Sequence, residues 1–356
     1  MIDFLVIGGG IAGTSAAASL SKQGSVTLLE AEDALGYHTS GRSAALYEAN
    51  YGQPSTIELN RASLAYHQET GVLSPRGLLL IGSPDGADAF AKDQAKMALA
   101  PVTIAEAKAM IPILDTDVVD RAAYDPDAWD IDTDKLLQGF VATTRSNGGT
   151  VISKAPVSAI CRDGAGWIVT AGDVDYVARH IVNAAGAWAD QIAEMAGVAP
   201  IGLQPLRRSM GRIPAPGGHD VSTWPMMFGP GEDWYAKPDA GALLVSPAEE
   251  DAVVPHDAYA DDMVLAEGFA RYEAHVTAPV TRLLSSWAGL RTFAPDRTLV
   301  LGPDPDEDGF IWCAGQGGYG MQSSPAAGQL IADLVTGEKP QVAKDVVAQL
   351  SPSRFR

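Results

Sequence analysis

The sequence predicts an α/β fold, α+β when the whole chain is considered, and three observations support this prediction. Strand and helix patterns alternate at both ends of the chain, which is typical of parallel sheets with helices on their faces. A run of shorter strand patterns fills the middle. Apolar strands end in glycine-rich turns at three separated places, 8–13, 184–188 and 315–320. We therefore expect one domain assembled from discontinuous segments, and a second, sheet-rich domain between them.

The first of these turns has the pattern of a dinucleotide-binding site. An apolar strand over Ile2–Ile7 runs into a G-x-G-x-x-G turn, and a helix is predicted over Thr14–Leu20. Gly8 permits the tight turn, Gly10 lets the backbone approach the phosphates, and Gly13 allows the helix to pack on the strand. The N–H groups at the start of that helix face the anion. The pattern therefore indicates a site for a pyrophosphate in a Rossmann-like domain.

An acidic residue closes the second strand of this unit. The strand predicted over Ser25–Leu29 ends at Glu30, 20 residues after Gly10, where a carboxylate can hydrogen-bond a ribose hydroxyl. No arginine stands beside Glu30, which argues against a 2′-phosphate on that ribose. The order of these elements favours a dinucleotide-binding site over a turn that has no binding function. The elements are a strand, a glycine turn, a helix, a second strand and an acidic residue. Both a flavin and a nicotinamide dinucleotide satisfy the pattern.

The remaining elements follow from hydrophobic periodicity and from glycine and proline positions. Helices are predicted over residues 57–69, 87–110 with a break at Pro101, 134–146, 263–276 and 324–334. Strands are predicted over residues 78–82, 150–153, 155–161, 166–171, 178–183, 242–245 and 310–314, with longer strands between 208 and 235. We place the discontinuous dinucleotide-binding domain in residues 1–70, 132–203 and 287–356, and the substrate-binding domain in residues 71–131 and 204–286.

Charge and composition exclude several classes of partner. The chain carries 25 Lys and Arg against 44 Asp and Glu, a formal net charge of −19, which would repel nucleic acid and anionic lipid. An anionic substrate must therefore be attracted by a local basic site. No run approaches the roughly 18 apolar residues of a membrane-spanning helix, and the first strand begins at once, which leaves no room for a cleavable signal. We expect a cytoplasmic protein.

The cysteines and histidines predict neither a disulfide nor a metal site. Cys161 and Cys313 stand far apart without a C-x-x-C motif, and the six histidines show no ligand spacing. The acidic run Asp130–Asp134 lacks the glycine and distal glutamate of a calcium loop. It is better interpreted as the cap of the helix that follows it.

Five short motifs occur in an order typical of one enzyme superfamily. They are Gly8–Gly13 with Glu30, Gly41–Ala45, Asn183–Trp188, Trp287–Arg291 and Gln316–Gln322. With them the chain resembles, nearly end to end, the FAD-dependent D-amino acid oxidase superfamily, and within it most of all the bacterial D-arginine dehydrogenases and related D-amino acid dehydrogenases. The resemblance implies an extended FAD and oxidation of the Cα–N bond of an amino acid, with hydride transfer from Cα to the flavin.

The resemblance also implies how FAD is held. In covalently flavinylated relatives a cysteine occurs just beyond the segment that matches Arg291, but Thr292 and Phe293 stand there in this chain. We therefore expect FAD to be bound non-covalently. The implied cofactor contacts are Gly8, Gly10, Ile11, Ala12, Gly13, Glu30, His38, Arg42, Ser43, Ala44, Ala45, Val157, Ala185, Gly186, Trp188, Gly317, Gly318, Tyr319, Gly320, Met321 and Gln322.

Substrate binding and catalysis need a carboxylate clamp. An arginine fork pairs both oxygens of a carboxylate in a fixed plane, which orients Cα toward the flavin. Arg291 and one of Arg207 and Arg208 are the candidates, because adjacent residues in a strand face opposite sides; the family match favours Arg208. Tyr51 and Tyr235 match substrate-contacting tyrosines of the family, and they or water would accept the amine proton.

The side-chain pocket differs from that of the arginine-oxidising relatives. Those relatives place a histidine where this chain has Leu46 and a glutamate where it has Leu78, so the pocket is expected to be apolar. Gly318 would offer its carbonyl to the substrate amine, and Gln322 would complete the pocket.

These residues predict an FAD-dependent D-amino acid dehydrogenase that acts on neutral or apolar substrates and yields an imine, which hydrolyses to a 2-oxo acid and ammonia. The alternatives are a glycine or sarcosine type of amine oxidase, a 2-hydroxy acid dehydrogenase, and the flavin subunit of an opine dehydrogenase assembly. The electron acceptor, whether quinone, dye or oxygen, is not encoded in any motif.

Overall fold

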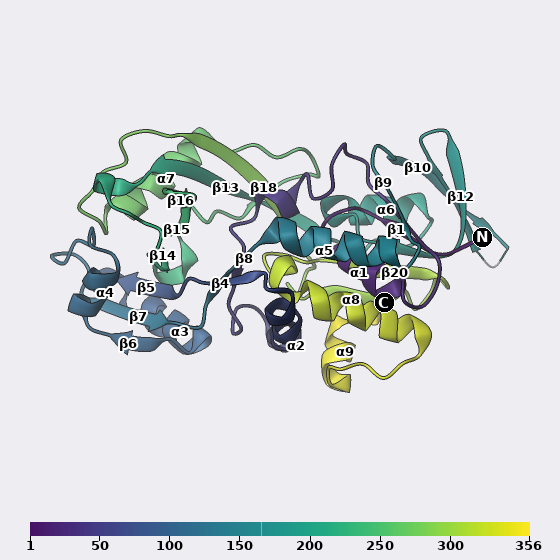
Figure 1. Cartoon of the computed structure of the whole chain (residues 1–356), viewed down its shortest axis with the longest axis horizontal. Coiled ribbons are helices and arrows are strands. Elements are labelled where there is room, and N and C mark those ends of the chain that lie inside the picture. Colours follow the sequence, from purple (N-terminus) through teal and green to yellow (C-terminus); the bar gives the residue numbers. More distant parts are fainter. Residues whose placement is uncertain (165) are drawn as a thin grey trace.

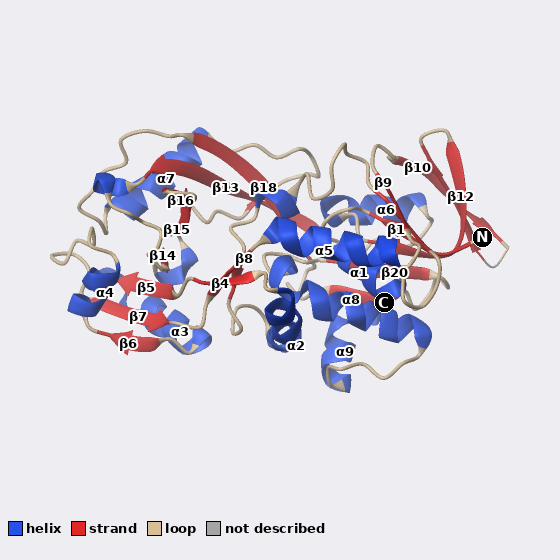
Figure 2. Ribbon diagram, in the orientation of Figure 1, coloured by secondary structure: helices blue, strands red, loops and turns tan. Residues whose placement is uncertain are grey.

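The computed structural model describes residues 1–164 and 166–356 of the chain. It shows an elongated molecule in which each half contains a large sheet (Figure 1). Helices gather mainly around the sheet that contains the N-terminal strand, while the other half is richer in strands (Figure 2). This arrangement confirms the predicted fold class of a Rossmann-like domain with a second, sheet-rich domain.

The sheet of the first half is mainly parallel. Its strands are β1 (Ile2–Ile7), β2 (Val26–Leu29), β9 (Thr150–Ile152), β10 (Val157–Asp163), β11 (Gly166–Ala171), β12 (Val174–Asn183), β19 (Val300–Pro303) and β20 (Phe310–Ala314). They are ordered β10-β11-β12-β1-β2-β9, and β20 pairs with both β12 and β19. Parallel strands with both faces covered are continuously apolar, and β2 and β20 are buried at every residue.

Alternate residues of β1 serve two different cores. Phe4 and Val6 pack with the helices α1 (Ile11–Leu20) and α8 (Gly320–Thr336), whereas Leu5 and Ile7 face the side covered by α6 (Ala189–Met195). The remaining helices are α2 (Pro54–Thr70), α3 (Ala87–Met97), α4 (Ile104–Met110), α5 (Thr133–Ser146), α7 (Asp262–Glu273) and α9 (Lys344–Leu350). Helices on both faces of β1 leave its carboxyl end as the place where a ligand can reach the sheet.

The second sheet is antiparallel apart from one pair of strands. Its strands are β5 (Leu78–Gly82), β6 (Ala100–Val102), β7 (Arg121–Asp125), β13 (Gln204–Pro214), β14 (Met226–Phe228), β15 (Tyr235–Asp239), β16 (Ala242–Ser246), β17 (Asp251–Ala252) and β18 (Ser285–Phe293). The order is β17-β13-β16-β15-β14-β5-β7-β6, with β18 paired to β13. A small sheet of β3 (Leu46–Tyr47), β8 (Trp129–Ile131) and β4 (Leu73–Pro75) is a separate unit.

Most predicted elements are present, and three differ for identifiable reasons. Helix α1 begins at Ile11, directly after the glycines. The predicted helix over 87–110 is two helices separated by β6, where Pro101 occupies an edge strand, a position that tolerates the missing N–H. Helix α8 begins at Gly320 although it contains Pro325, and the Met321 carbonyl accepts the Ser324 hydroxyl at 3.1 Å. Asp132 caps α5 as predicted, accepting the N–H of Lys135.

The domain boundaries remain predictions, and one strand bears on them. β18 pairs with β13 from Gln204↔Phe293 to Arg212↔Ser285. A division between residues 286 and 287 would separate β18 from the sheet to which it is hydrogen-bonded. The strand that carries Arg291 therefore belongs structurally to the second sheet.

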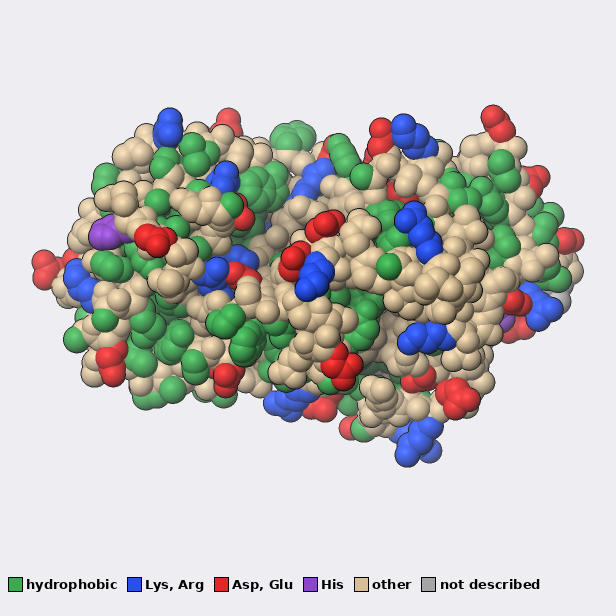
Figure 3. All heavy atoms as spheres, viewed as in Figure 1, with side chains coloured by type: hydrophobic (Ala, Val, Ile, Leu, Met, Phe, Trp, Pro, Cys, Tyr) green, Lys and Arg blue, Asp and Glu red, His purple; other side chains and the backbone are tan. Residues whose placement is uncertain are grey.

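The face of the molecule in Figure 3 shows no concentrated basic patch. Acidic and basic side chains are interspersed over the face in Figure 3. Among the described residues no helix is both long enough and apolar enough to cross a membrane.

Two helix glycines provide a test of the packing between α1 and α8. Gly139→Ala in α5 should raise the free energy of unfolding by about 1 kcal/mol, since a Cβ there meets nothing within 4 Å. Gly328→Ala in α8 should lower it by about 1–3 kcal/mol, because its Cβ would lie 2.6 Å from backbone atoms of Ser15. Urea unfolding of both variants measures the difference; equal stabilisation would contradict the close approach of these helices.

Candidate functional site

A groove runs from the carboxyl ends of β1 and β12 to the second sheet, and it consists of three adjoining cavities. We call them the nucleotide cavity, which includes Glu30, Val157 and Trp188, the middle cavity, which includes Ser43 and Gly317, and the substrate pocket, which includes Leu46, Leu78 and Gln322. Neighbouring cavities share lining residues, so the groove is continuous.

Most of the predicted cofactor residues lie along this groove. The nucleotide cavity contains Gly8, Gly10, Glu30, His38, Val157, Ala185, Gly186 and Trp188. The middle cavity contains Ile11, Ala12, Arg42, Ser43, Ala44, Gly317, Gly318, Gly320 and Met321, and the substrate pocket contains Ala45 and Gln322. Gly13 and Tyr319 are not among the residues that line these three cavities, and their contacts with the cofactor remain predictions. A Cβ on Gly13 would lie 1.9 Å from the Gly8 carbonyl oxygen, and the Tyr319 ring packs against Tyr51 and Phe293.

The geometry of the glycine turn fits the pyrophosphate and ribose of FAD. Gly8 has a φ of 111°, which disfavours any side chain. Helix α1 begins at the groove, and its first turn carries no acidic side chain that would repel a phosphate. Glu30 accepts the N–H of Gly9 at 2.7 Å, so its carboxylate is fixed at the edge of the nucleotide cavity. These residues would hold the dinucleotide part of the cofactor.

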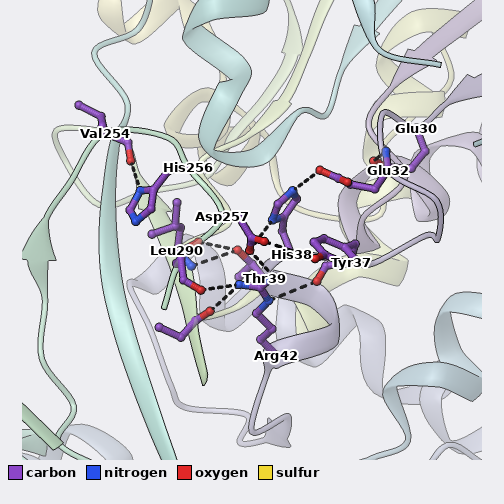
Figure 4. A network of polar contacts seen from close by, with 12 residues as sticks. Glu30, Glu32, Tyr37, His38, Thr39, Arg42, Val254, His256, Asp257 and Leu290 are labelled. Atoms are coloured by element: carbon purple, nitrogen blue, oxygen red, sulfur yellow. Dashed lines mark hydrogen bonds and ion pairs between the residues drawn. The ribbon is translucent and has the colours of Figure 1, made fainter. Parts of the chain in front are cut away.

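The segment around Asp257 is bound to residues beside the groove (Figure 4). Asp257 forms an ion pair with Arg42 at 2.5 Å, and Arg42 also donates to the carbonyls of Ala258 and Ala288. His38 lies 2.9 Å from Glu32 and 3.8 Å from Asp257. Protein atoms therefore engage the guanidinium of Arg42, which connects the segment around Asp257 to a residue that lines the groove.

The two predicted clamp arginines emerge on one face of the β13–β18 ladder. Arg208 is paired with Gly289, and Arg291 is paired with Leu206, so the two guanidinium groups are diagonal neighbours on the same side. Arg207 faces the other way and reaches Asp251 at 2.7 Å. The structure thus separates Arg208 from Arg207 by strand alternation, as the sequence predicts, and both Arg208 and Arg291 line the groove.

The surroundings of these two arginines shift their pKa values in opposite directions. Burial, together with the nearby Arg291, lowers the pKa of Arg208, which is 8% exposed and donates to the Glu249 carbonyl at 2.9 Å. Burial alone would lower the pKa of Arg291, but Tyr51, Tyr235 and Glu232 raise it above its usual value. The guanidinium of Arg291 lies against Gly318, where a Cβ would come within 3.0 Å of Nη1. Two guanidinium groups this close favour an anion between them.

Tyr51 and Tyr235, the two predicted tyrosines, line the same cavity as Arg208 and Arg291. Tyr51 donates to Oε2 of Glu232 at 3.0 Å, and Lys96 approaches the same carboxylate at 3.3 Å. Burial and the charge of Glu232 raise the pKa of Tyr51 well above its usual value, so its hydroxyl is a poor base at neutral pH. Tyr235 lines the groove, and its hydroxyl contacts the sulfur of Met210 at 3.2 Å.

The substrate pocket is largely apolar, as Leu46 and Leu78 predict. Its other apolar lining residues are Met97, Met226, Phe228, Trp234 and Met321. Gln322 accepts the backbone N–H of Glu48 through its side-chain oxygen at 2.9 Å, so that oxygen is partly engaged by the protein. Gly318 lies between the middle cavity and the pocket.

Sequence reasoning missed two acids of this pocket. Glu232 follows the turn Gly229–Gly231, and the placement of that turn ahead of the Tyr235 strand is the one signal that could have indicated it. Glu48 is absent from the predicted site residues. Its burial at 3% depends on packing between distant segments and leaves no local sequence signal.

Comparison with known proteins identifies the family. The model of the FAD dependent oxidoreductase family, DAO, matches residues 3–334. The chain belongs to this family and is an FAD-dependent oxidoreductase.

Several distant relatives match almost the whole chain. FAD-dependent oxidoreductase domain-containing protein 1 of Bos taurus is 25% identical, with 94% of this chain and 81% of that protein covered. Glycine oxidase of Bacillus licheniformis is also 25% identical, covering 94% and 93%. The crystal structure of L-proline dehydrogenase from P. horikoshii superimposes with a TM-score of 0.85 at 22% identity, covering 99% and 97%, which shows a shared fold.

Proposed function

We propose that the protein oxidises D-amino acids with neutral or apolar side chains to 2-oxo acids and ammonia, as a non-covalent FAD enzyme. The observation that carries this proposal is the pair Arg208 and Arg291 at the junction of the cofactor groove and an apolar pocket. The motifs that resemble D-arginine dehydrogenases favour D-amino acids. Glycine has no side chain to fill the apolar pocket, which argues against the glycine oxidase alternative.

Each residue of the junction has a distinct part in this reaction. Arg291, assisted by Arg208, would bind the substrate carboxylate and fix the direction of Cα. FAD, when bound, would accept the hydride that leaves Cα. The Gly318 carbonyl would accept a hydrogen bond from the amine.

The amine must lose a proton before the imine can form. Tyr51 is already a donor to Glu232, so the carboxylate of Glu232 lies one hydrogen bond beyond the Tyr51 hydroxyl. We propose that Tyr51 orients the amine and that Glu232, through Tyr51 or a water molecule, takes the proton. This refines the expectation that Tyr51, Tyr235 or water accepts the proton, because the raised pKa of Tyr51 makes its hydroxyl a poor final acceptor.

The manner of FAD binding can be tested directly. Thr292 and Phe293 offer no thiol to the flavin. Acid precipitation of the purified holoenzyme should release all of the flavin into the supernatant. Flavin that stays in the protein pellet would contradict non-covalent binding.

Anaerobic flavin bleaching tests the substrate class. At about pH 7, D-leucine, D-methionine and D-phenylalanine should bleach the flavin, and their kcat/KM with a dye acceptor should exceed that of D-arginine by at least about 100-fold, or about 2.7 kcal/mol. The same panel should include L-amino acids, glycine, sarcosine and 2-hydroxy acids. Reduction by glycine or sarcosine alone, or by a hydroxy acid alone, would establish the corresponding alternative. An inert flavin that reacts only with a partner chain present would favour the opine dehydrogenase subunit.

Replacing Arg291 tests the clamp. Arg291→Met should lower kcat/KM by about 30-fold to several thousand-fold, since losing one partner of a desolvated carboxylate costs about 2–5 kcal/mol. The flavin spectrum should stay nearly unchanged. Arg208→Met should be milder, because Arg208 is already bound to Glu249 and Glu250.

The matched control is Arg207→Met, on the same strand but the opposite face, which should leave kcat/KM within a few-fold of the parent. Steady-state kinetics of the three variants decide the assignment. If Arg291→Met behaved like Arg207→Met, the carboxylate would have to bind elsewhere.

A further inference from the structure

The substrate pocket holds a buried acid that the proposed reaction does not use. Glu48 directly follows β3 and lies on the same side of the extended segment as Leu46, because alternate residues share a face. It lines the pocket and is 3% exposed. Tyr47, between them, points into the core and donates to the Asn60 carbonyl at 3.0 Å. The chain therefore presents a second carboxyl, besides that of Glu232, to a pocket with many apolar lining residues.

The hydrogen bonds of Glu48 leave one oxygen without a donor. Oε1 accepts the N–H of Asn50 at 2.8 Å, whereas the buried Oε2 receives no hydrogen bond from any group in residues 1–164 and 166–356. The nearby carboxyl of Asp125 disfavours a negative charge on Glu48 and so favours the protonated form. Burial and the neighbouring Asp125 raise the pKa of Glu48 to about 8.

Within residues 1–164 and 166–356, Glu48 has no ion-pair partner. Behind it, Asp125 on β7 and Asp127 in the following turn add negative charge. The other charged and titratable groups around the pocket are Glu232 with its partner Lys96, and Tyr51, Tyr235, Arg208 and Arg291 at the flavin end. No described Lys or Arg forms an ion pair with Glu48. A buried carboxylate of this kind is costly unless a partner of opposite charge is supplied.

We propose that Glu48 determines the specificity of the pocket: while its carboxyl holds a proton the pocket takes uncharged side chains, and once the proton has left it takes a side chain that ends in an ammonium group. The inference rests on the proposed function, because Arg291 must hold the carboxylate at the other end of the ligand. The cation would then replace the proton as the partner of Glu48, so binding of a cationic side chain releases one proton.

A pair of ligands isolates this effect. Hexanoate and 6-aminohexanoate have the same carboxylate and the same carbon chain, and they differ only in the terminal ammonium group. Neither has an α-amine, so neither can be oxidised, and both report binding through the visible spectrum of the holoenzyme flavin. The measured quantity is the ratio of their dissociation constants, Kd(hexanoate)/Kd(6-aminohexanoate), between about pH 6 and 9.5, where the terminal amine stays largely charged.

The ratio should rise with pH, by up to about tenfold per pH unit, and level off above the pKa of Glu48, because one proton is exchanged for the cation. Glu48→Gln should give a ratio that is low and flat across this range. Asp125→Asn should move the rise to lower pH, since it removes the acidic neighbour that raises the pKa of Glu48. It also provides an independent test if Glu48→Gln fails to fold. Glu69→Gln, an exposed acid on α2, is the matched control and should leave the curve unchanged.

The outcomes separate this inference from the function on which it rests. A flat ratio in the parent protein, or an unchanged rise in Glu48→Gln, would overturn the role of Glu48 while leaving the carboxylate clamp intact. If neither ligand perturbed the flavin at any pH, the clamp itself would be wrong, and this inference would fall with it.

Discussion

The site depends on the register of β18 against β13. In this antiparallel ladder, directly paired residues lie on the same face, so Arg208 and Arg291 share a face only because Leu206 is paired with Arg291. A slip of one residue would turn Arg291 toward the face of Arg207 and Asp251. Nine pairs fix the register. Gly289 opposite Arg208 adds no side chain between the two guanidinium groups. The backbone thus holds together two like charges that would otherwise separate.

The closeness of Arg208 and Arg291 explains why acids and tyrosines lie around them. Glu250 lies 3.3 Å from Arg208, and Glu232 lies beside Tyr51 and raises the pKa of Arg291. These contacts offset part of the repulsion without filling the space between the arginines. What remains is a preference for an anion supplied by a ligand, in a protein whose net charge of −19 would otherwise repel one. Local positive potential therefore comes from two side chains on one ladder.

The wall between the cofactor groove and the pocket is held from the second sheet. Ala44 and Ala45 line the pocket, and Ala45 has a φ of 44°, which is uncommon for a residue with a side chain. Lys237, two residues after Tyr235 on β15, donates to the Ala44 carbonyl and pairs with Asp130 at 2.7 Å. Since alternate residues of a strand share a face, the same strand places Tyr235 in the site and fixes the wall beside it.

Local patterns predicted much of the fold and the cofactor groove, whereas contacts between distant segments escaped them. The glycine turn and Glu30 form one continuous unit, so their spacing is visible in the sequence. Strand alternation likewise separates Arg208 from Arg207. The strand β6 was missed because Pro101 breaks a helical pattern, and only its edge position in the sheet explains it. Glu232 and Glu48 were not assigned roles because their place in the pocket depends on segments far from them in sequence.

The two pocket acids show why burial alone does not define the role of a carboxyl. Glu232 has Lys96 and the Tyr51 hydroxyl as partners, so a negative charge there is matched by the protein itself. Glu48 faces Asp125 and has one oxygen without a donor, so the protein leaves its charge unmatched. An acid whose charge is matched can serve the chemistry of every substrate alike. An acid whose charge is unmatched binds a ligand most favourably when that ligand supplies a cation, so Glu48 would discriminate between the side chains of different amino acids.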